Sequence, residues 1–294
     1  MITGPSINSY FDEILSFSPG ASITQRSSLD DDAGYVREMF GTRWLGKPFV
    51  VTEYGHVFWN SFRREAGLLV PAYAALQDWD ILCLHGAGAI DLTFNQPWAQ
   101  KRSLMPYGVG LDPITRADET LAALLFRRGD VSAARTTVAI PFGRPQDMLN
   151  SGQGAISSSL TTLGLISRIG LDRVDAPASR SDIQLPLLGS ASPEKSSLRF
   201  GNRPASPSRD PRDDRLAENI SKLRLAGVIS AQNQTNASAR VYQSDTNEIL
   251  VDAPQRLARV ITPRTEAISF EKISSPYVLG ALTIDAASGR PWSH

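Results

Sequence analysis

The chain has 294 residues, of which 41% are hydrophobic and 20% charged, a composition typical of a folded globular protein and not of a disordered one. Thirty basic residues balance thirty acidic ones, so the charge gives no reason to expect nucleic acid or a membrane surface as a partner. The single cysteine excludes an internal disulfide, and three histidines are too few for a Cys/His zinc site. We expect no metal and no cofactor.

The N-terminal segment MITGPSINSYFDEIL lacks the basic start and the apolar run of a signal peptide. No stretch reaches the roughly 18 consecutive apolar residues that a membrane span needs. The sequence therefore predicts no membrane partner, and it does not indicate a compartment.

The first half of the chain alternates between short apolar runs and helical patterns. A run at 49–51, after Pro48, predicts a buried parallel strand, and the run ILCLHGAG at 81–88 predicts a second one. Between them, apolar residues at helical spacing predict a helix over 68–79, with Pro71 in its first turn or at a kink. A further helix is expected over 115–128, since Gly129 follows it. This order is typical of a parallel α/β fold.

The character of the sequence changes after about residue 131. The segment 176–214 is rich in proline and serine and has little apolar periodicity, so we expect a disordered insertion there. Beyond it, five short β-rich runs are separated by polar turns, starting with ISKLRLAGVIS at 220–230 and ending with YVLGALTIDAA at 277–287. Such runs predict an antiparallel β-sandwich.

The strongest candidate for chemistry is Glu53, which directly follows the first predicted strand. A carboxylate at that point lies at the carboxyl end of a parallel sheet, where active sites of α/β proteins assemble. Aromatic, imidazole and amide side chains surround it in sequence, and these groups suit a sugar ring, which offers an apolar C–H face and hydroxyls. They are Tyr54, His56, Trp59, Asn60 and His85. Trp79, by contrast, is more typical of core packing.

The stretch KPFVVTEYGHVFWNSFRREAGLLVPAYAALQDWD resembles the seventh strand and following helix of clan A glycoside hydrolases, which are retaining (β/α)8-barrel enzymes. The resemblance implies that Glu53 is the catalytic nucleophile. PSINSYFDEI is similar to the sixth-strand region of that family, which implies that Tyr10 hydrogen-bonds the nucleophile. ILCLHGAG resembles the eighth strand, and YQSDTNEILVDAPQRLARVITPRTEAI the sandwich that follows the barrel in some members.

The resemblance therefore implies a fold that is α/β plus all-β. Residues 1–135 are expected to form the C-terminal part of a (β/α)8 barrel, with its sixth to eighth strands. Residues 136–294 are expected to form a partial antiparallel β-sandwich that contains the insertion at 176–214.

The sequence departs from the family at the general acid/base. Only 52 residues precede Glu53, and no Asn-Glu pair occurs among them to match the family's fourth-strand residue. Asp12, Glu13 and Asp91 are alternatives, although each is more typical of a solvated loop carboxylate. We therefore expect a truncated retaining glycoside hydrolase whose isolated chain is weak or inactive.

The alternative is a non-catalytic carbohydrate-binding fragment or one that depends on a partner. The open sheet edges of an incomplete barrel predict self-association or pairing with a missing half.

Overall fold

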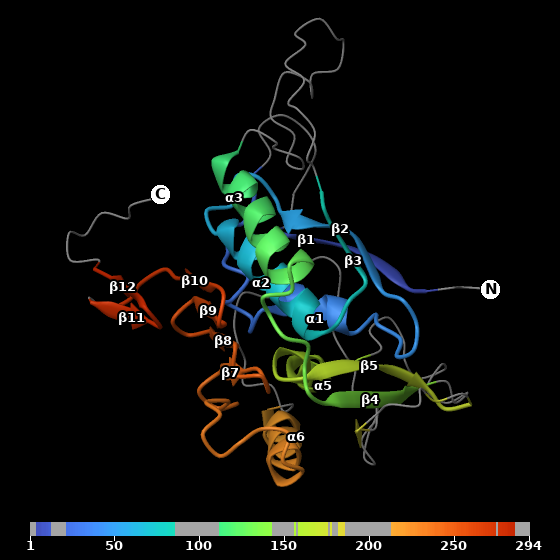
Figure 1. Cartoon of the computed structure of the whole chain (residues 1–294). Helices are drawn as coiled ribbons and strands as arrows, with labels where there is room; N and C mark the ends of the chain where they lie inside the picture. The colour runs from blue at the N-terminus through green and yellow to red at the C-terminus, as the bar shows by residue number, and fades with distance from the viewer. Residues whose placement is uncertain are drawn as a thin grey trace, which may run out of the picture.

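The computed structural model describes residues 4–12, 22–85, 112–142, 156, 158–175, 177, 182–185, 213–274 and 276–285. In these ranges the chain forms four small sheets and a set of short helices (Figure 1). The described strands run parallel in two of the sheets and antiparallel in the other two.

The N-terminal sheet has three parallel strands, and strands that follow one another in the chain are neighbours in the sheet. They are β1 (Ser6–Phe11), β2 (Val50–His56) and β3 (Ile81–Leu84). The strands predicted at 49–51 and after Asp80 are thus confirmed, although residues 86–88 of the second lie outside the described residues. Phe49 and Val51 are fully buried, but Val50 is half-buried and Thr52 is exposed, so the expected burial of this strand on both faces holds for one face only.

Helices α1 (Gly34–Phe40) and α2 (Arg64–Leu76) follow β1 and β2 in the chain. The helix predicted over 68–79 is confirmed as α2, which begins earlier and ends sooner. Its apolar residues at helical spacing face the core, and Pro71 lies in its interior, not in its first turn. Trp79 is a core residue, packed against Phe40 and Phe49.

The helix predicted over 115–128 is also confirmed. Helix α3 (Pro113–Ala122) continues as a π-helical turn, η2 (Ala123–Arg127). The Asp112 side chain caps α3 by accepting hydrogen bonds from the backbone N–H groups of Ile114 and Thr115, both at 3.4 Å. Gly129 follows with a φ of +72°, a conformation that glycine adopts without strain at a helix end.

A second parallel sheet was not predicted. Its strand order is β5-β4-β6, and a short helical segment lies between its first two strands in the chain. The elements are β4 (Thr137–Phe142), α5 (Ser158–Thr161), η3 (Thr162–Leu165), β5 (Arg168–Arg173) and β6 (Ile183–Gln184). Trp44 bridges to Leu171, so the loop before β2 extends this sheet.

Helix α6 (Asp213–Leu225) occupies most of the run 220–230 that was expected to be a strand, and this expectation is wrong. Leu216, Ile220 and Leu223 are buried at spacings of four and three residues, which is a helical period. The same helix begins inside the predicted insertion at 176–214. Most of that insertion lies outside the described residues.

The strands predicted beyond residue 239 are confirmed. Four of them form an antiparallel sheet in the order β10-β9-β8-β7, and two form a separate hairpin. Their bounds are β7 (Val241–Gln243), β8 (Ile249–Asp252), β9 (Leu257–Ile261), β10 (Glu266–Ser269), β11 (Tyr277–Leu279) and β12 (Leu282–Ile284).

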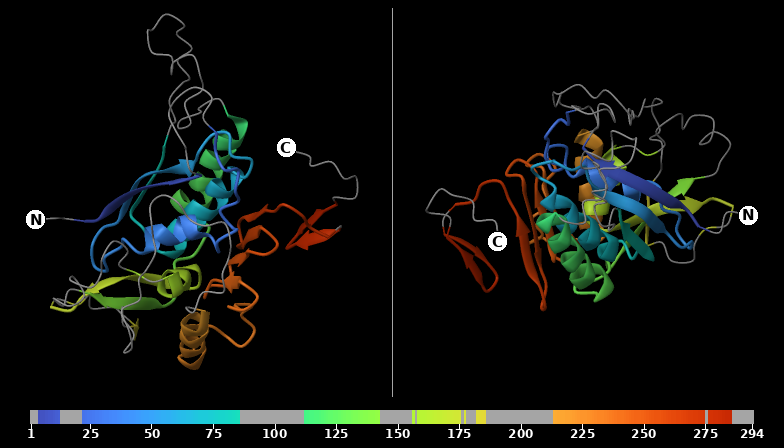
Figure 2. Two further views of the ribbon diagram at one scale, coloured as in Figure 1. Left: turned by 180° about the vertical axis from the view of Figure 1, so that it is seen from behind. Right: turned by 90° about the horizontal axis from the view of Figure 1, so that it is seen from above.

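The predicted fold class is wrong: within the described residues no sheet closes into a barrel. The four-stranded sheet does not pack on a second sheet as a sandwich would. It packs on α2, through β9 and β10, and α2 also contacts β2, so α2 lies between this sheet and β1–β3 (Figure 2, right). Strands and helices can be predicted from local sequence patterns, whereas closure of a sheet into a barrel depends on which layer covers each apolar face.

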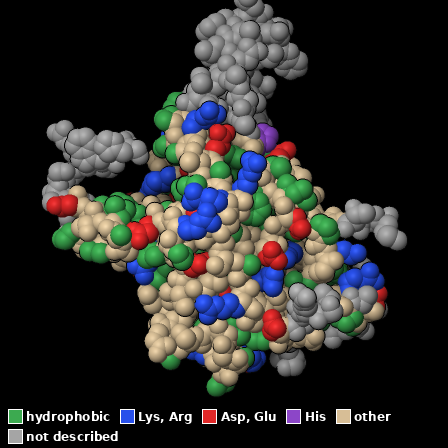
Figure 3. All heavy atoms as spheres, viewed as in Figure 1, with side chains coloured by type: hydrophobic (Ala, Val, Ile, Leu, Met, Phe, Trp, Pro, Cys, Tyr) green, Lys and Arg blue, Asp and Glu red, His purple; other side chains and the backbone are tan. Residues whose placement is uncertain are grey.

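Most of the buried apolar side chains between residues 29 and 260 form one contiguous cluster. The domain boundary near residue 135 stays a prediction. On the face seen in Figure 3, basic and acidic side chains both occur, in keeping with the equal numbers of each in the sequence. No helix of the described part of the chain is long and apolar enough to cross a membrane.

Candidate functional site

Three side chains from neighbouring strands meet toward the carboxyl end of the β1–β3 sheet, although Glu53 lies in the middle of β2 and not directly after the strand, as was expected. The Tyr10 hydroxyl, from β1, donates a hydrogen bond to Oε2 of Glu53, on β2. Nδ1 of His85, directly after β3, lies 3.1 Å from the same oxygen. The rings of Tyr10 and His85 are edge-to-face, with centroids 5.5 Å apart. The structure thus brings together three of the predicted residues, and Glu53 and His85 face the same side, as predicted.

The register of the strands produces this meeting. Asn8 is the partner of Glu53 and Tyr10 that of Gly55, after an irregularity between Ile7 and Asn8 that shifts the pairing by one residue. Because side chains alternate along a strand, Tyr10 projects from the same face as Asn8 and therefore as Glu53. On the other side, the backbone N–H of His85 donates to the Tyr54 carbonyl at 3.0 Å, which aligns His85 with the end of β2.

The cluster is open to solvent. The side chains of Glu53 and His85 are 36% and 37% exposed, so their pairing adds little to stability, about 1 kcal/mol or less. Within the described residues both contacts of Glu53 reach Oε2, and none reaches Oε1. The carboxylate is therefore held in one orientation and still presents an oxygen to a ligand.

Trp59 lies three residues beyond β2 and is 59% exposed, an unusual exposure for so large an apolar side chain. Its ring lies against Phe58, with centroids 3.8 Å apart, and its carbonyl accepts a hydrogen bond from the Gln25 side chain at 3.0 Å. An exposed indole at this end of the sheet offers an apolar surface on which a sugar ring stacks.

Three other predicted site residues, Tyr54, Asn60 and His56, do not join the Glu53 cluster. Tyr54 is 1% exposed, and its shielded hydroxyl has no hydrogen-bond partner in the described part of the chain. Burial raises its pKa. Asn60 is fully buried and donates to the Asp12 carboxylate at 3.2 Å and to the Arg26 carbonyl at 2.9 Å. Both are parts of the scaffold.

His56 is half-buried between the rings of Phe11 and Tyr35. Its two ring nitrogens are shielded from solvent. Burial lowers the pKa of His56 to about 3, so the ring is neutral at neutral pH. It therefore provides packing, not charge, beneath the site.

Asp12 is committed to structural hydrogen bonds. Its carboxylate is buried, accepts from the Thr24 hydroxyl and from Asn60, and accepts the backbone N–H of Arg26 at 3.4 Å. The other two candidate acids, Glu13 and Asp91, lie outside the described residues.

Tyr35 was missed by the sequence analysis. Its hydroxyl accepts the backbone N–H of Gly55 at 2.8 Å and lies 3.2 Å from the carbonyl oxygen of Ser9, to which it donates. This hydroxyl thereby ties β1 to β2 next to Tyr10 and Glu53. Nothing in the sequence around Tyr35 marks it, because its role arises from the packing of α1 on the sheet.

In the described part of the chain, no group of three or more His, Cys, Asp or Glu side chains is placed to hold a metal ion. Comparison with models of known protein families, with curated proteins and with solved structures finds no match.

Proposed function

We propose that this chain carries the nucleophile of a retaining glycoside hydrolase, and that Glu53 is that nucleophile. The observation that supports it is the contact of Tyr10 and His85 with a single oxygen of Glu53 toward the carboxyl end of a parallel sheet. The resemblance of the surrounding sequence to clan A enzymes supports the same role.

The geometry suits nucleophilic attack on an anomeric carbon. Tyr10 and His85 fix Oε2, so Oε1 forms the new bond to the anomeric carbon while the bond to the leaving-group oxygen breaks. The leaving oxygen takes a proton from a general acid. Water then attacks the glycosyl ester, gives its proton to the conjugate base of that acid, and releases Glu53.

The second carboxyl of such a site stands about 5 to 5.5 Å from the first. Asp12 does not suit this role, because three hydrogen bonds hold its buried carboxylate within the scaffold. We therefore propose that the general acid is supplied from outside the described residues, by Glu13, by Asp91 or by a partner chain. Without it, turnover requires a leaving group that departs without protonation.

A second candidate function, carbohydrate binding without catalysis, is favoured by the same structural commitment of Asp12. Exposed Trp59 and the oriented carboxylate of Glu53 would then hold a sugar by stacking and hydrogen bonding. The two candidates differ in one observable: only the first forms a covalent bond between Glu53 and the sugar.

The test uses 2,4-dinitrophenyl 2-deoxy-2-fluoroglycosides of both anomers and several sugars. Their leaving group needs no acid, and the fluorine slows hydrolysis of the ester. We expect one of them to add its glycosyl mass to the chain, with peptide mapping locating the ester on Glu53. Glu53→Gln abolishes the adduct.

Glu119→Gln is the matched control, because Glu119 is 34% exposed and paired with a cation, Arg116, much as Glu53 is paired with His85. This variant keeps the adduct. A panel that binds the chain without forming any ester would support the non-catalytic candidate and overturn the nucleophile assignment.

A further inference from the structure

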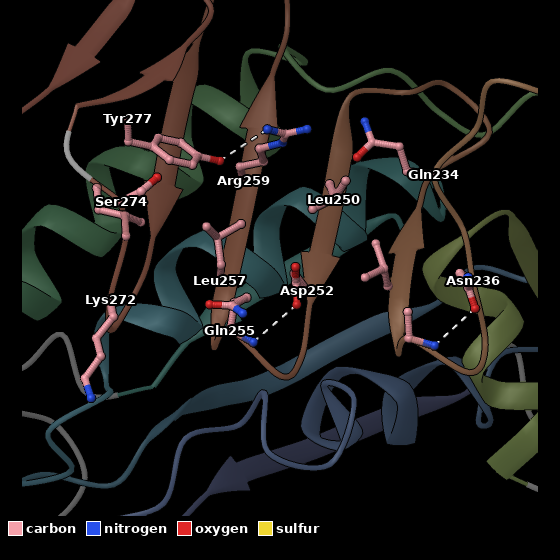
Figure 4. A pocket seen from close by; sticks show the side chains of 13 residues that line it. Gln234, Asn236, Leu250, Asp252, Gln255, Leu257, Arg259, Lys272, Ser274 and Tyr277 are labelled. Atoms are coloured by element: carbon pink, nitrogen blue, oxygen red, sulfur yellow. Dashed lines mark hydrogen bonds between the residues drawn. The ribbon is translucent and has the colours of Figure 1, made fainter.

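A groove of about 450 Å³ crosses the outer face of the antiparallel sheet (Figure 4). Its volume lies in the range of about 300 to 1,000 Å³ that small-molecule sites occupy. Strands β8 and β9 form its floor, while the loop after β10 and the start of β11 form one side. Nothing in the role proposed for Glu53 uses this groove.

The floor of the groove is partly apolar: of the four lining residues on β8 and β9, two are leucines and two, Asp252 and Arg259, are charged. Val251 and Val260 belong to the core cluster beneath the sheet, toward α2. Leu250 and Leu257 point to the opposite, outer face of the sheet and line the groove. Leu250 is 6% exposed and Leu257 is 7% exposed. A strip of shielded aliphatic surface at the base of a polar groove suits the C–H face of a sugar.

Two cations line the groove without a carboxylate partner. Within the described residues, neither Arg259 nor Lys272 forms an ion pair. Arg259 donates to the Tyr277 hydroxyl at 3.2 Å, which holds the tyrosine ring at the side of the groove (Figure 4). The one acid in the lining, Asp252, accepts the backbone N–H of Gln255 at 3.2 Å and so stabilises the β8–β9 turn. The lining thus has a net positive charge that favours an anion.

Uncommitted amides complete the lining. The side chains of Gln234 and Gln255 are exposed and reach the groove from two different loops. Within the described residues, no hydrogen bond involves either side-chain amide. An amide both donates and accepts, which matches the paired hydroxyls of a sugar. Cations, amides, a tyrosine and an apolar floor together describe a ligand that is polyhydroxylated and negatively charged.

We propose that this groove binds an oligosaccharide that carries carboxylates, such as a chain of uronic acids, with Lys272 and Arg259 receiving the carboxylates. The groove's own residues point to an anionic, hydroxyl-rich ligand, and the choice of a glycan rests on the function proposed for Glu53. Since α2 and the β1–β3 sheet separate the groove from Glu53, this is an accessory site that holds the polymer while another part of it is processed.

The experiment is calorimetric titration of the full chain with tetragalacturonate, beside its fully methyl-esterified form, which keeps the hydroxyls and loses the charges. We expect binding of the acid form only, weakened by high ionic strength. Lys272→Gln and Arg259→Gln should each weaken it about tenfold, the loss of one charge-assisted contact. Lys272 is exposed and unpaired in the described residues, so its substitution leaves the fold intact.

Lys47→Gln is the control, because Lys47 is equally exposed but lies before β2, away from the groove. It should bind as the unaltered chain does. Equal binding of polyglutamate or dextran sulfate, or binding that Lys272→Gln and Arg259→Gln do not change, overturns the proposal. Glu53→Gln separates the two sites: loss of tetragalacturonate binding in that variant alone would place the ligand at Glu53. Failure to trap an ester on Glu53 leaves this titration valid.

Discussion

The cluster around Glu53 on β2 and the interior beneath α2 both contain carboxyl groups, but their surroundings differ in opposite ways. Glu53 is partly exposed and is oriented by a tyrosine and a histidine. Glu65, fully buried at the start of α2, accepts three hydrogen bonds from Ser27 and Ser28, at 2.6 to 2.7 Å. Asp118, on α3, is 7% exposed, and no hydrogen bond reaches it from the described residues.

The difference shows which carboxyl is available for chemistry. A catalytic carboxylate needs an oxygen that is oriented and that a ligand can reach, and Glu53 meets both conditions. Glu65 is oriented but enclosed, so it fixes the chain around residue 27 to α2. Asp118 is enclosed and has no hydrogen bond within the described residues, and its carboxyl group lies where a side chain on Gly67 would stand. Its burial therefore destabilises the α2–α3 interface. The predictions that follow test this division.

Glu53→Gln removes the carboxylate proposed as the nucleophile and keeps the shape of the side chain. Hydrolysis of an activated aryl glycoside should fall by about 10³-fold or more, because an amide cannot form the glycosyl ester. Steady-state rates measure this, and the thermal midpoint should stay unchanged, since the exposed Glu53–His85 pair adds little to stability. If the variant kept the hydrolysis rate, Glu53 would have only a structural role, as Glu65 does.

Glu65→Ala should destabilise the fold by about 3 kcal/mol, because it leaves the Ser28 N–H and two hydroxyls buried without their acceptor. Urea unfolding measures this as a lower midpoint at constant slope. Aryl glycoside hydrolysis per folded molecule should not change. A loss of activity larger than the loss of folded protein would mean that Glu65 takes part in the site.

Asp118→Asn should stabilise the protein at alkaline pH. Burial, together with the nearby charge of Asp112, raises the pKa of Asp118 to about 8. In the unfolded chain the pKa is about 4, so the folded state keeps a proton that the unfolded state loses, and stability falls as pH rises from about 4 to about 8. Asparagine removes this dependence.

The expected gain at pH 9 is about 5 kcal/mol, since the folded and unfolded pKa values differ by about four and each unit is worth about 1.4 kcal/mol, and the gain should vanish near pH 4. Thermal unfolding across this range measures it. Glu119→Gln, at the neighbouring exposed position of α3, serves as the control and should show no such pH dependence. Equal stability of Asp118→Asn and the unaltered chain at pH 9 would show that Asp118 reaches water or a partner.

The site could be predicted from the sequence as far as it depends on local pattern. An apolar β-branched run ending at Glu53, and a second one ending before His85, place both residues at the same edge of a parallel sheet. Tyr10 came from the family resemblance alone. The opposite orientation of Tyr54 was missed because the predicted strand ended before Glu53, whereas β2 continues to His56 and consecutive side chains of a strand point to opposite faces.

The fold could be predicted less well than the elements. The spacing of Leu216, Ile220 and Leu223 indicates a helix, but a proline- and serine-rich segment directly precedes it and led to a strand assignment there. The parallel pair of β4 and β5 was missed because pairing over such a separation leaves no local mark. The sheet β7–β10 was read as half of a sandwich, since an alternating strand does not show whether a sheet or a helix covers it.

Tyr10→Phe has the smallest expected effect and tests the site most finely. It removes the hydroxyl that contacts Oε2 of Glu53 and leaves the ring that packs edge-on against His85. Because His85 still reaches Oε2, we expect kcat on an activated aryl glycoside to fall by only about tenfold, with KM nearly unchanged. Tyr54→Phe is the matched control: its hydroxyl is buried, faces the core and has no partner in the described residues, so kcat should not change. Comparing the two variants separates the loss of a hydroxyl that orients Glu53 from the loss of any tyrosine hydroxyl on β1 or β2. If both variants lowered kcat equally, the hydroxyl of Tyr10 would act through the sheet and not through Glu53. The contrast between the accessible Glu53 cluster and the enclosed carboxyls would then not account for the hydrolysis.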